Sequence, residues 1–92
     1  MSITIVTVKQ EGIVNIPRDA AIVTIHFIGI DGMFNKDYRI QTTIENVNYD
    51  DSPIMATSII AKEQDYCEVA LSGYTENDGY KLHWEATNMI KE

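Results

Sequence analysis

The chain has 92 residues, with 14 acidic and 7 basic side chains and a net charge of −7 when its histidines are neutral. Hydrophobic residues make up 45% and charged residues 23%, which is typical of a globular domain and excludes an intrinsically disordered chain. The length predicts a single domain over residues 1–92. The acidity disfavours free DNA or an anionic membrane as a direct partner.

The first half of the chain alternates apolar and polar residues with the period of β-strands. Strands are expected over residues 3–8, 13–16, 21–28 and 38–45, with a break at Glu11-Gly12 between the first two. The alternation is clearest in residues 21–28, where Val23, Ile25 and Phe27 form an apolar face. We expect such faces to build the core of an antiparallel sheet.

A loop with two glycines, Gly29 and Gly32, is predicted between residues 28 and 38, and it carries Met33 and Phe34. Two large apolar side chains in a loop either plug the end of a core or stand out as an interface anchor. We expect Met33 and Phe34 to contribute a partner-binding anchor.

Residues 52–64 depart from the strand period. Their apolar positions follow an i, i+1, i+4, i+5 spacing, at Met55, Ala56, Ile59 and Ile60. Asp51 or Ser52 can cap a helix here, with Pro53 in its first turn. We therefore predict an α+β fold, a single antiparallel sheet with one short helix packed on it. The alternative is another strand, which would make the protein an all-β sandwich.

Two more strands are expected near the C-terminus, over residues 67–72 and 80–87. The sequence Asn77-Asp78-Gly79 between them is a hairpin-turn signal, with Gly79 suited to a left-handed backbone conformation.

Charge is divided unevenly along the chain. Residues 1–44 contain four acidic and four basic side chains, so the ten acidic and three basic side chains of residues 45–92 account for the whole net charge. This division predicts a one-sided negative surface that attracts a basic partner. The expected carriers lie in predicted loops, at a helix end or on a polar strand face: Asp50, Asp51, Glu63, Asp65, Glu68, Glu76 and Asp78.

No catalytic, nucleotide-binding or metal-binding motif is present in the sequence. His26, His83 and Cys67 fall in separate predicted strands, so we expect packed or surface imidazoles and a buried thiol. A single cysteine cannot form an intramolecular disulfide, which is typical of a reducing cytosol. The N-terminus lacks the basic and apolar regions of a signal peptide, and no 18-residue apolar run occurs. We expect no catalytic residue, metal or cofactor.

The sequence resembles a phage-encoded anti-CRISPR protein, from the small inhibitor families that act on the type I-F (Csy) surveillance complex. The resemblance covers the whole chain and rests on its length, its acidity, and two runs, NIPRDAAIVTIHF at residues 15–27 and DGMFNKDYRI at residues 31–40. It names a family without naming functional residues.

The resemblance implies a non-catalytic inhibitor in the host bacterial cytoplasm. Such an inhibitor binds the protein–guide RNA complex through its basic protein subunits and blocks recognition or hybridisation of target DNA. Lys36 and Arg39, which flank the glycine loop, are the candidates for a limited contact with the guide RNA. Two other classes stay open: a phage structural or accessory module, and an immunity-type inhibitor of a basic nuclease.

Overall fold

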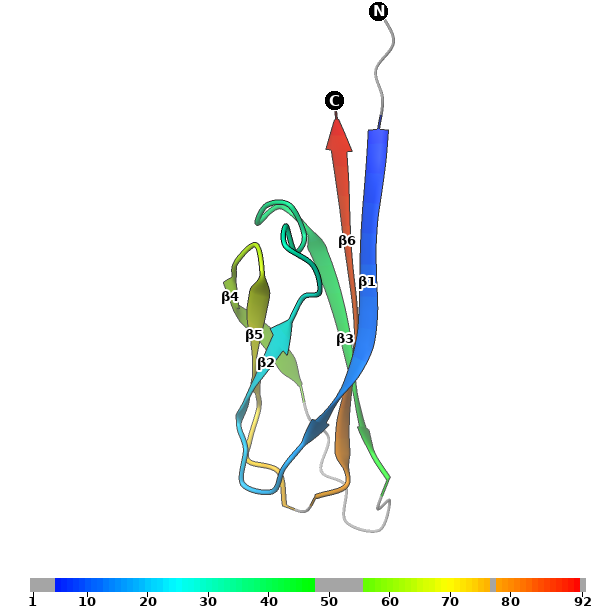
Figure 1. Ribbon diagram of the computed structural model, residues 1–92. Coiled ribbons are helices and arrows are strands. Elements are labelled where there is room, and N and C mark those ends of the chain that lie inside the picture. The colour runs from blue at the N-terminus through cyan, green and yellow to red at the C-terminus, as the bar shows by residue number, and fades with distance from the viewer. Residues whose placement is uncertain (1–4, 48–55, 77, 92) are drawn as a thin grey trace, which may run out of the picture.

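The computed structural model describes residues 5–47, 56–76 and 78–91, which form two three-stranded antiparallel sheets. The first sheet has the order β1-β6-β3 and contains β1 (Ile5–Ile16), β6 (Tyr80–Lys91) and β3 (Arg39–Asn46). The second has the order β2-β5-β4 and contains β2 (Ile22–His26), β5 (Tyr66–Leu71) and β4 (Thr57–Lys62). Figure 1 shows the two sheets facing each other.

The core lies between the inner faces of the two sheets. The alternation seen in the sequence places every second residue of β2, β5 and β6 there. The predicted apolar faces of residues 21–28, 67–72 and 80–87 are confirmed, because their apolar members are buried: Val23, Ile25, Phe27, Cys67, Val69, Leu71, Tyr80, Leu82, Trp84 and Ala86. The ring of Phe27 joins the sheets, with its centroid 5.0 Å from that of Tyr38 and 5.7 Å from that of Trp84.

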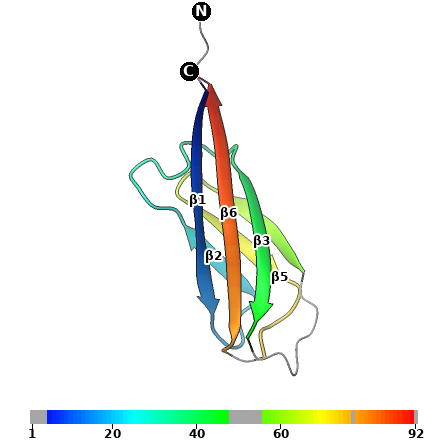
Figure 2. The same cartoon turned by 90° about the vertical axis from the view of Figure 1, so that its right-hand side faces the viewer.

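The first sheet is longer than the second. β1 pairs with β6 from Ile5–Lys91 to Ile16–Tyr80, whereas β3 pairs with β6 only as far as Arg39–Thr87. Residues 5–8 and 88–91 therefore form a two-stranded ribbon that continues past β3 (Figure 2).

The predicted break at Glu11-Gly12 is wrong, because β1 runs through both residues without interruption. Gly12 lies opposite Trp84 in the register, and a Cβ atom at Gly12 would lie 3.1 Å from two atoms of the indole ring. The glycine therefore makes room for a large core side chain and does not end the strand.

The predicted helix over residues 52–64 is also wrong, and with it the α+β class and its single sheet. In the described part of this segment, residues 56–64, the chain forms β4 and contains no helix, so the all-β alternative fits. A β-bulge explains the misleading spacing: Ile59 pairs with Val69 and Ala61 with Glu68, which leaves Ile60 as the extra residue. The bulge interrupts the alternation, and the β-branched Thr57, Ile59 and Ile60 favour a strand locally.

The hairpin expected at residues 77–79 does not join paired strands. β5 belongs to the second sheet and β6 to the first, so residues 72–79 cross between the sheets. Gly79 is not among the described residues with a positive φ, which include Gly29 and Gly32. The period of two is the same whichever strand lies alongside, so it does not identify the partner of a strand.

Candidate partner-binding surface

The predicted acidic residues lie along the second sheet and at both of its ends. Glu63 and Asp65 are in the turn between β4 and β5, and Glu68 is in β5. Glu76 and Asp78 are in the connection from β5 to β6, at the opposite end of β5. Asp50 and Asp51 lie outside the described residues.

The two halves of the chain interleave in the fold, so the division of charge along the sequence is not a division in space. β1 of the first half pairs with β6 of the second, and β2 pairs with β5. As a result, basic groups of the first half meet acids of the second: Lys36 Nζ lies 3.0 Å from a carboxylate oxygen of Glu63. The backbone N–H of Arg18 donates a 2.9 Å hydrogen bond to Asp78 Oδ1.

Because of these contacts, fewer of the predicted acidic residues are available to a basic partner. Glu63 is already paired with a lysine, and Asp78 holds the connection from β1 to β2. Asp65 and Glu76 are exposed and Glu68 is half-buried, and among the described residues none of the three forms an ion pair. We call Asp65, Glu68 and Glu76 the acidic set, since a partner can reach their charge without breaking an ion pair in that part of the chain.

The structure separates the two predicted anchor residues. Met33 is fully buried in the core, so its prediction as an exposed anchor is corrected. Its backbone N–H donates a 2.9 Å hydrogen bond to the carbonyl of Gln64, which brings the side chain between the sheets. Phe34 is 49% exposed and has a φ of +73°. Phe34 alone of the two can reach a partner.

The two basic residues predicted to contact guide RNA also differ, because only one of them is available to a partner. Lys36 is paired with Glu63, whereas Arg39 is exposed at the start of β3 and forms no ion pair with a described residue. Arg39 also lines an open groove of about 620 Å³ with Asp37, Gln41 and Glu85, so carboxylates share the groove with its guanidinium.

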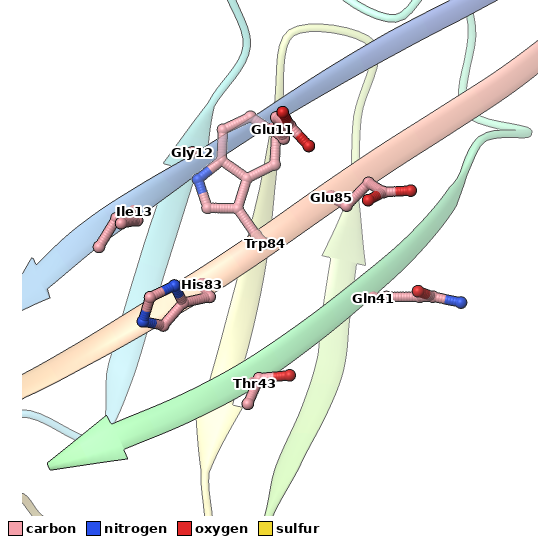
Figure 3. Close-up of a pocket in the computed structure, with 8 residues that line it drawn as sticks. All are labelled: Glu11, Gly12, Ile13, Gln41, Thr43, His83, Trp84 and Glu85. Atoms are coloured by element: carbon pink, nitrogen blue, oxygen red, sulfur yellow. The ribbon is translucent and has the colours of Figure 1, made fainter.

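A second open groove, of about 490 Å³, lies on the outer face of the first sheet (Figure 3). Its rim is polar, with Gln41 and Thr43 from β3 and His83 and Glu85 from β6. His83 Nε2 lies 3.0 Å from Glu45 Oε1 beside it. Glu11 and Glu85 both approach Lys9, at 3.9 and 3.7 Å, so these carboxylates are partly compensated.

Sequence analysis missed two exposed isoleucines beside Phe34. Ile28 is 81% exposed and Ile30 is fully exposed, both in the connection between β2 and β3. The sequence carried a weak signal for Ile28, because it follows His26 on the polar side of the β2 alternation. Ile30 carried none.

The described histidines and cysteine do not form a nucleophile site. Cys67 is buried on the inner face of β5, whereas His26 is exposed on β2 and His83 lies on the outer face of the first sheet. The expected buried thiol is confirmed. Burial raises the pKa of Cys67 to about 11, against the opposing charge of Lys62, so the thiolate is disfavoured at neutral pH. Among the described residues, no three His, Cys, Asp or Glu side chains gather to hold a metal ion.

Comparison of the chain with protein-family models, curated proteins and solved structures found no match. In the part of the chain that the structure describes, no helix has the length and apolarity needed to cross a membrane.

Proposed function

We propose that the protein is a non-catalytic inhibitor that binds the type I-F CRISPR surveillance complex and blocks recognition or hybridisation of target DNA. The proposal begins from the resemblance of residues 15–27 and 31–40 to that class of phage protein. It adds a physical reason why such a complex would bind this chain.

The observation that carries the proposal is the acidic set. Asp65, Glu68 and Glu76 follow the second sheet from one end of β5 to the other, and no described lysine, arginine or histidine is paired with them. A CRISPR effector holds nucleic acid in a positively charged channel. Carboxylates at both ends of β5 and within it are complementary to such a channel, and charge would speed association.

The test measures DNA binding by the purified type I-F complex loaded with guide RNA. Preincubation with the wild-type protein is expected to abolish binding of a matching target duplex. The association rate of protein and complex should fall at least about threefold between 50 and 150 mM salt, because exposed charges are screened more at the higher concentration.

Charge reversal at the acidic set supplies the matched comparison. The double variant Glu68→Lys with Glu76→Lys should associate at least about tenfold more slowly than the wild type. Glu11→Lys with Glu85→Lys changes the net charge equally on the other sheet, and should have a much smaller effect. Circular dichroism and thermal melts establish that both variants fold. Equal slowing of both would mean that total charge, and not the acidic set, drives association.

Two results would replace the proposal. A wild-type protein that leaves DNA binding unchanged is not an inhibitor of this complex. If the same protein inhibits a basic nuclease through Glu68 and Glu76, it is an immunity-type inhibitor. If it binds virion proteins instead, it is a phage structural module.

A further inference from the structure

The connection between β2 and β3 exposes three large apolar side chains within seven residues. Ile28 is 81% exposed, Ile30 is fully exposed, and Phe34 is 49% exposed. We call residues 28–34 the apolar loop. Single exposed hydrophobic residues are common on proteins, but a group in one projecting loop marks an interaction site.

The backbone of the apolar loop is held in place by side chains from outside it. The side-chain amide of Gln10 donates to the carbonyl of Ile28 at 2.8 Å, and its oxygen accepts from the N–H of Ile28 at 2.7 Å. Asn88 donates to the carbonyl of Met33 at 2.7 Å, and Gln64 donates to the carbonyl of Asp31 at 3.0 Å. The loop is thus ordered before any partner binds, which lowers the entropy cost of binding.

Phe34 adds a second observation. Its φ of +73° lies in the left-handed region, which costs a bulky residue about 1 to 2 kcal/mol. Its N–H donates a 2.7 Å hydrogen bond to the carbonyl of Asp31, and this bond closes the turn. The turn would form more easily with glycine or asparagine at this position. Because Phe34 is 49% exposed, burial of its ring offsets the strain only in part, which favours a role in binding.

The charges around the loop indicate the kind of surface that it fits. Asp31 and Asp37 flank Phe34, and Asp65 accepts the backbone N–H of Phe27 through its carbonyl at 2.9 Å. None of the three carboxylates forms an ion pair with a described residue. A second copy of this chain would bring like charges together, and an anionic membrane would repel them.

We propose that Ile28, Ile30 and Phe34 insert into an apolar pocket, rimmed by lysine or arginine, on a folded protein partner. This inference rests on the proposed function, so the pocket belongs to a basic protein subunit of the surveillance complex. The apolar loop provides the short-range anchor, and the acidic set provides the long-range attraction.

The experiment measures the dissociation constant of each variant for the purified, guide-loaded complex. Ile28→Thr with Ile30→Thr is expected to weaken binding at least about tenfold, as loss of interface anchors does. The matched control is Ile13→Thr with Ile22→Thr, which changes two isoleucines that are each 58% exposed on strands. The control is expected to bind within about threefold of the wild type.

Phe34→Gly separates binding from folding. It removes the ring and relieves the positive φ, so its melting temperature should equal or exceed that of the wild type while its affinity falls at least about tenfold. If Phe34 were a core plug, the melting temperature would drop and the affinity would stay.

The outcomes distinguish the two proposals. If the wild type binds the complex and the loop variants bind as the control does, the loop inference fails and the proposed function stands. If the wild type does not bind the complex, the proposed function fails and the loop inference fails with it. Loop-dependent sedimentation with phosphatidylcholine vesicles, or loop-dependent dimerisation in ultracentrifugation, would overturn the protein partner in favour of a membrane or a second copy.

Discussion

At the scale of single residues, two buried tyrosines test how much a hydroxyl contributes to this core. Tyr38 and Tyr80 are each 1% exposed. The Tyr38 hydroxyl donates to the carbonyls of Glu63 at 2.9 Å and Tyr66 at 3.2 Å. The hydroxyl of Tyr80 is buried, and no described residue forms a hydrogen bond with it.

Replacing each tyrosine with phenylalanine should therefore have different effects. Tyr38→Phe is expected to lower the free energy of unfolding by about 1 to 2 kcal/mol, because it removes the hydroxyl that donates to the Glu63 carbonyl, whereas the Tyr66 carbonyl keeps the backbone N–H of Glu63. Tyr80→Phe should leave the free energy of unfolding unchanged or raise it slightly, because it removes a buried hydroxyl to which no described residue bonds. Urea denaturation of both variants gives the comparison. A larger loss for Tyr80→Phe would show that its hydroxyl is hydrogen-bonded in solution.

The raised pKa of Cys67 predicts how the free energy of unfolding changes at alkaline pH. Burial raises the pKa of its thiol from 9.0 to about 11, and burial also raises the pKa of the neighbouring Tyr38 hydroxyl. Both groups hold their protons more tightly in the folded state. The contribution of Cys67 to stability is therefore complete below pH 9 and is lost as the pH rises from 9 to 11, whereas that of Tyr38 is lost only above pH 10.

The free energy of unfolding should accordingly begin to fall as the pH rises above 9. Cys67→Ala should be less stable at pH 7, because it loses a buried side chain, but its decline between pH 9 and 10 should be shallower. Urea denaturation at several pH values measures both slopes. Identical slopes in the two proteins would assign the alkaline decline to other groups.

At the scale of elements, the apolar loop depends on one glycine more than on the others. Gly32 has a φ of +51°, and a Cβ there would lie 2.3 Å from the carbonyl oxygen of Gln64. Gly29 has a φ of +97° with open space around it, and Gly73 has open space without a positive φ. The three positions therefore separate steric contact from backbone conformation.

Alanine at each of these positions should give a graded series. Gly73→Ala is expected to be neutral or to stabilise by up to about 1 kcal/mol, and Gly29→Ala to cost about 1 to 2 kcal/mol. Gly32→Ala should cost more than Gly29→Ala, because it also displaces the Gln64 backbone that binds Met33. Thermal melts rank the variants. A Gly32→Ala protein as stable as Gly29→Ala would mean that the turn shifts freely.

The sequence was sufficient to locate most of the strands, but not β4 and not the pairing of β5 and β6. The apolar alternation around Val23, Leu82 and their neighbours identified buried faces correctly. It failed at β4, where the bulge at Ile60 produced helix-like spacing, and at the glycine turn near Gly79, where the chain changes sheet. The first error concerns the kind of element and the second the pairing of strands, and both the bulge and the pairing depend on contacts distant in sequence.

At the scale of the whole molecule, contacts between residues distant in sequence explain why the observed candidate site differs from the predicted one. Counting charges by halves of the sequence predicted one acidic surface, but each sheet contains strands from both halves, with β6 between β1 and β3 in the first sheet and β2 beside β5 in the second. Lys36 therefore forms an ion pair with Glu63, and Met33, which was predicted in an exposed loop, is buried in the core. The exposure of Ile30 was invisible in the sequence, because a loop's direction is set by what holds its ends.

The pairing of β1 with β6 also determines how the molecule resists force. Ile5 lies opposite Lys91, so the two long strands enter the sheet from the same end. A pull that separates these residues acts along the hydrogen bonds, which are perpendicular to antiparallel strands, and loads the pairs one after another. The hydrogen-bonded pairs of β1 and β6 would break in order, from Ile5–Lys91 towards Ile16–Tyr80. A force that separates Ile5 from Lys91 would therefore meet low mechanical resistance, however stable the protein is to heat or urea.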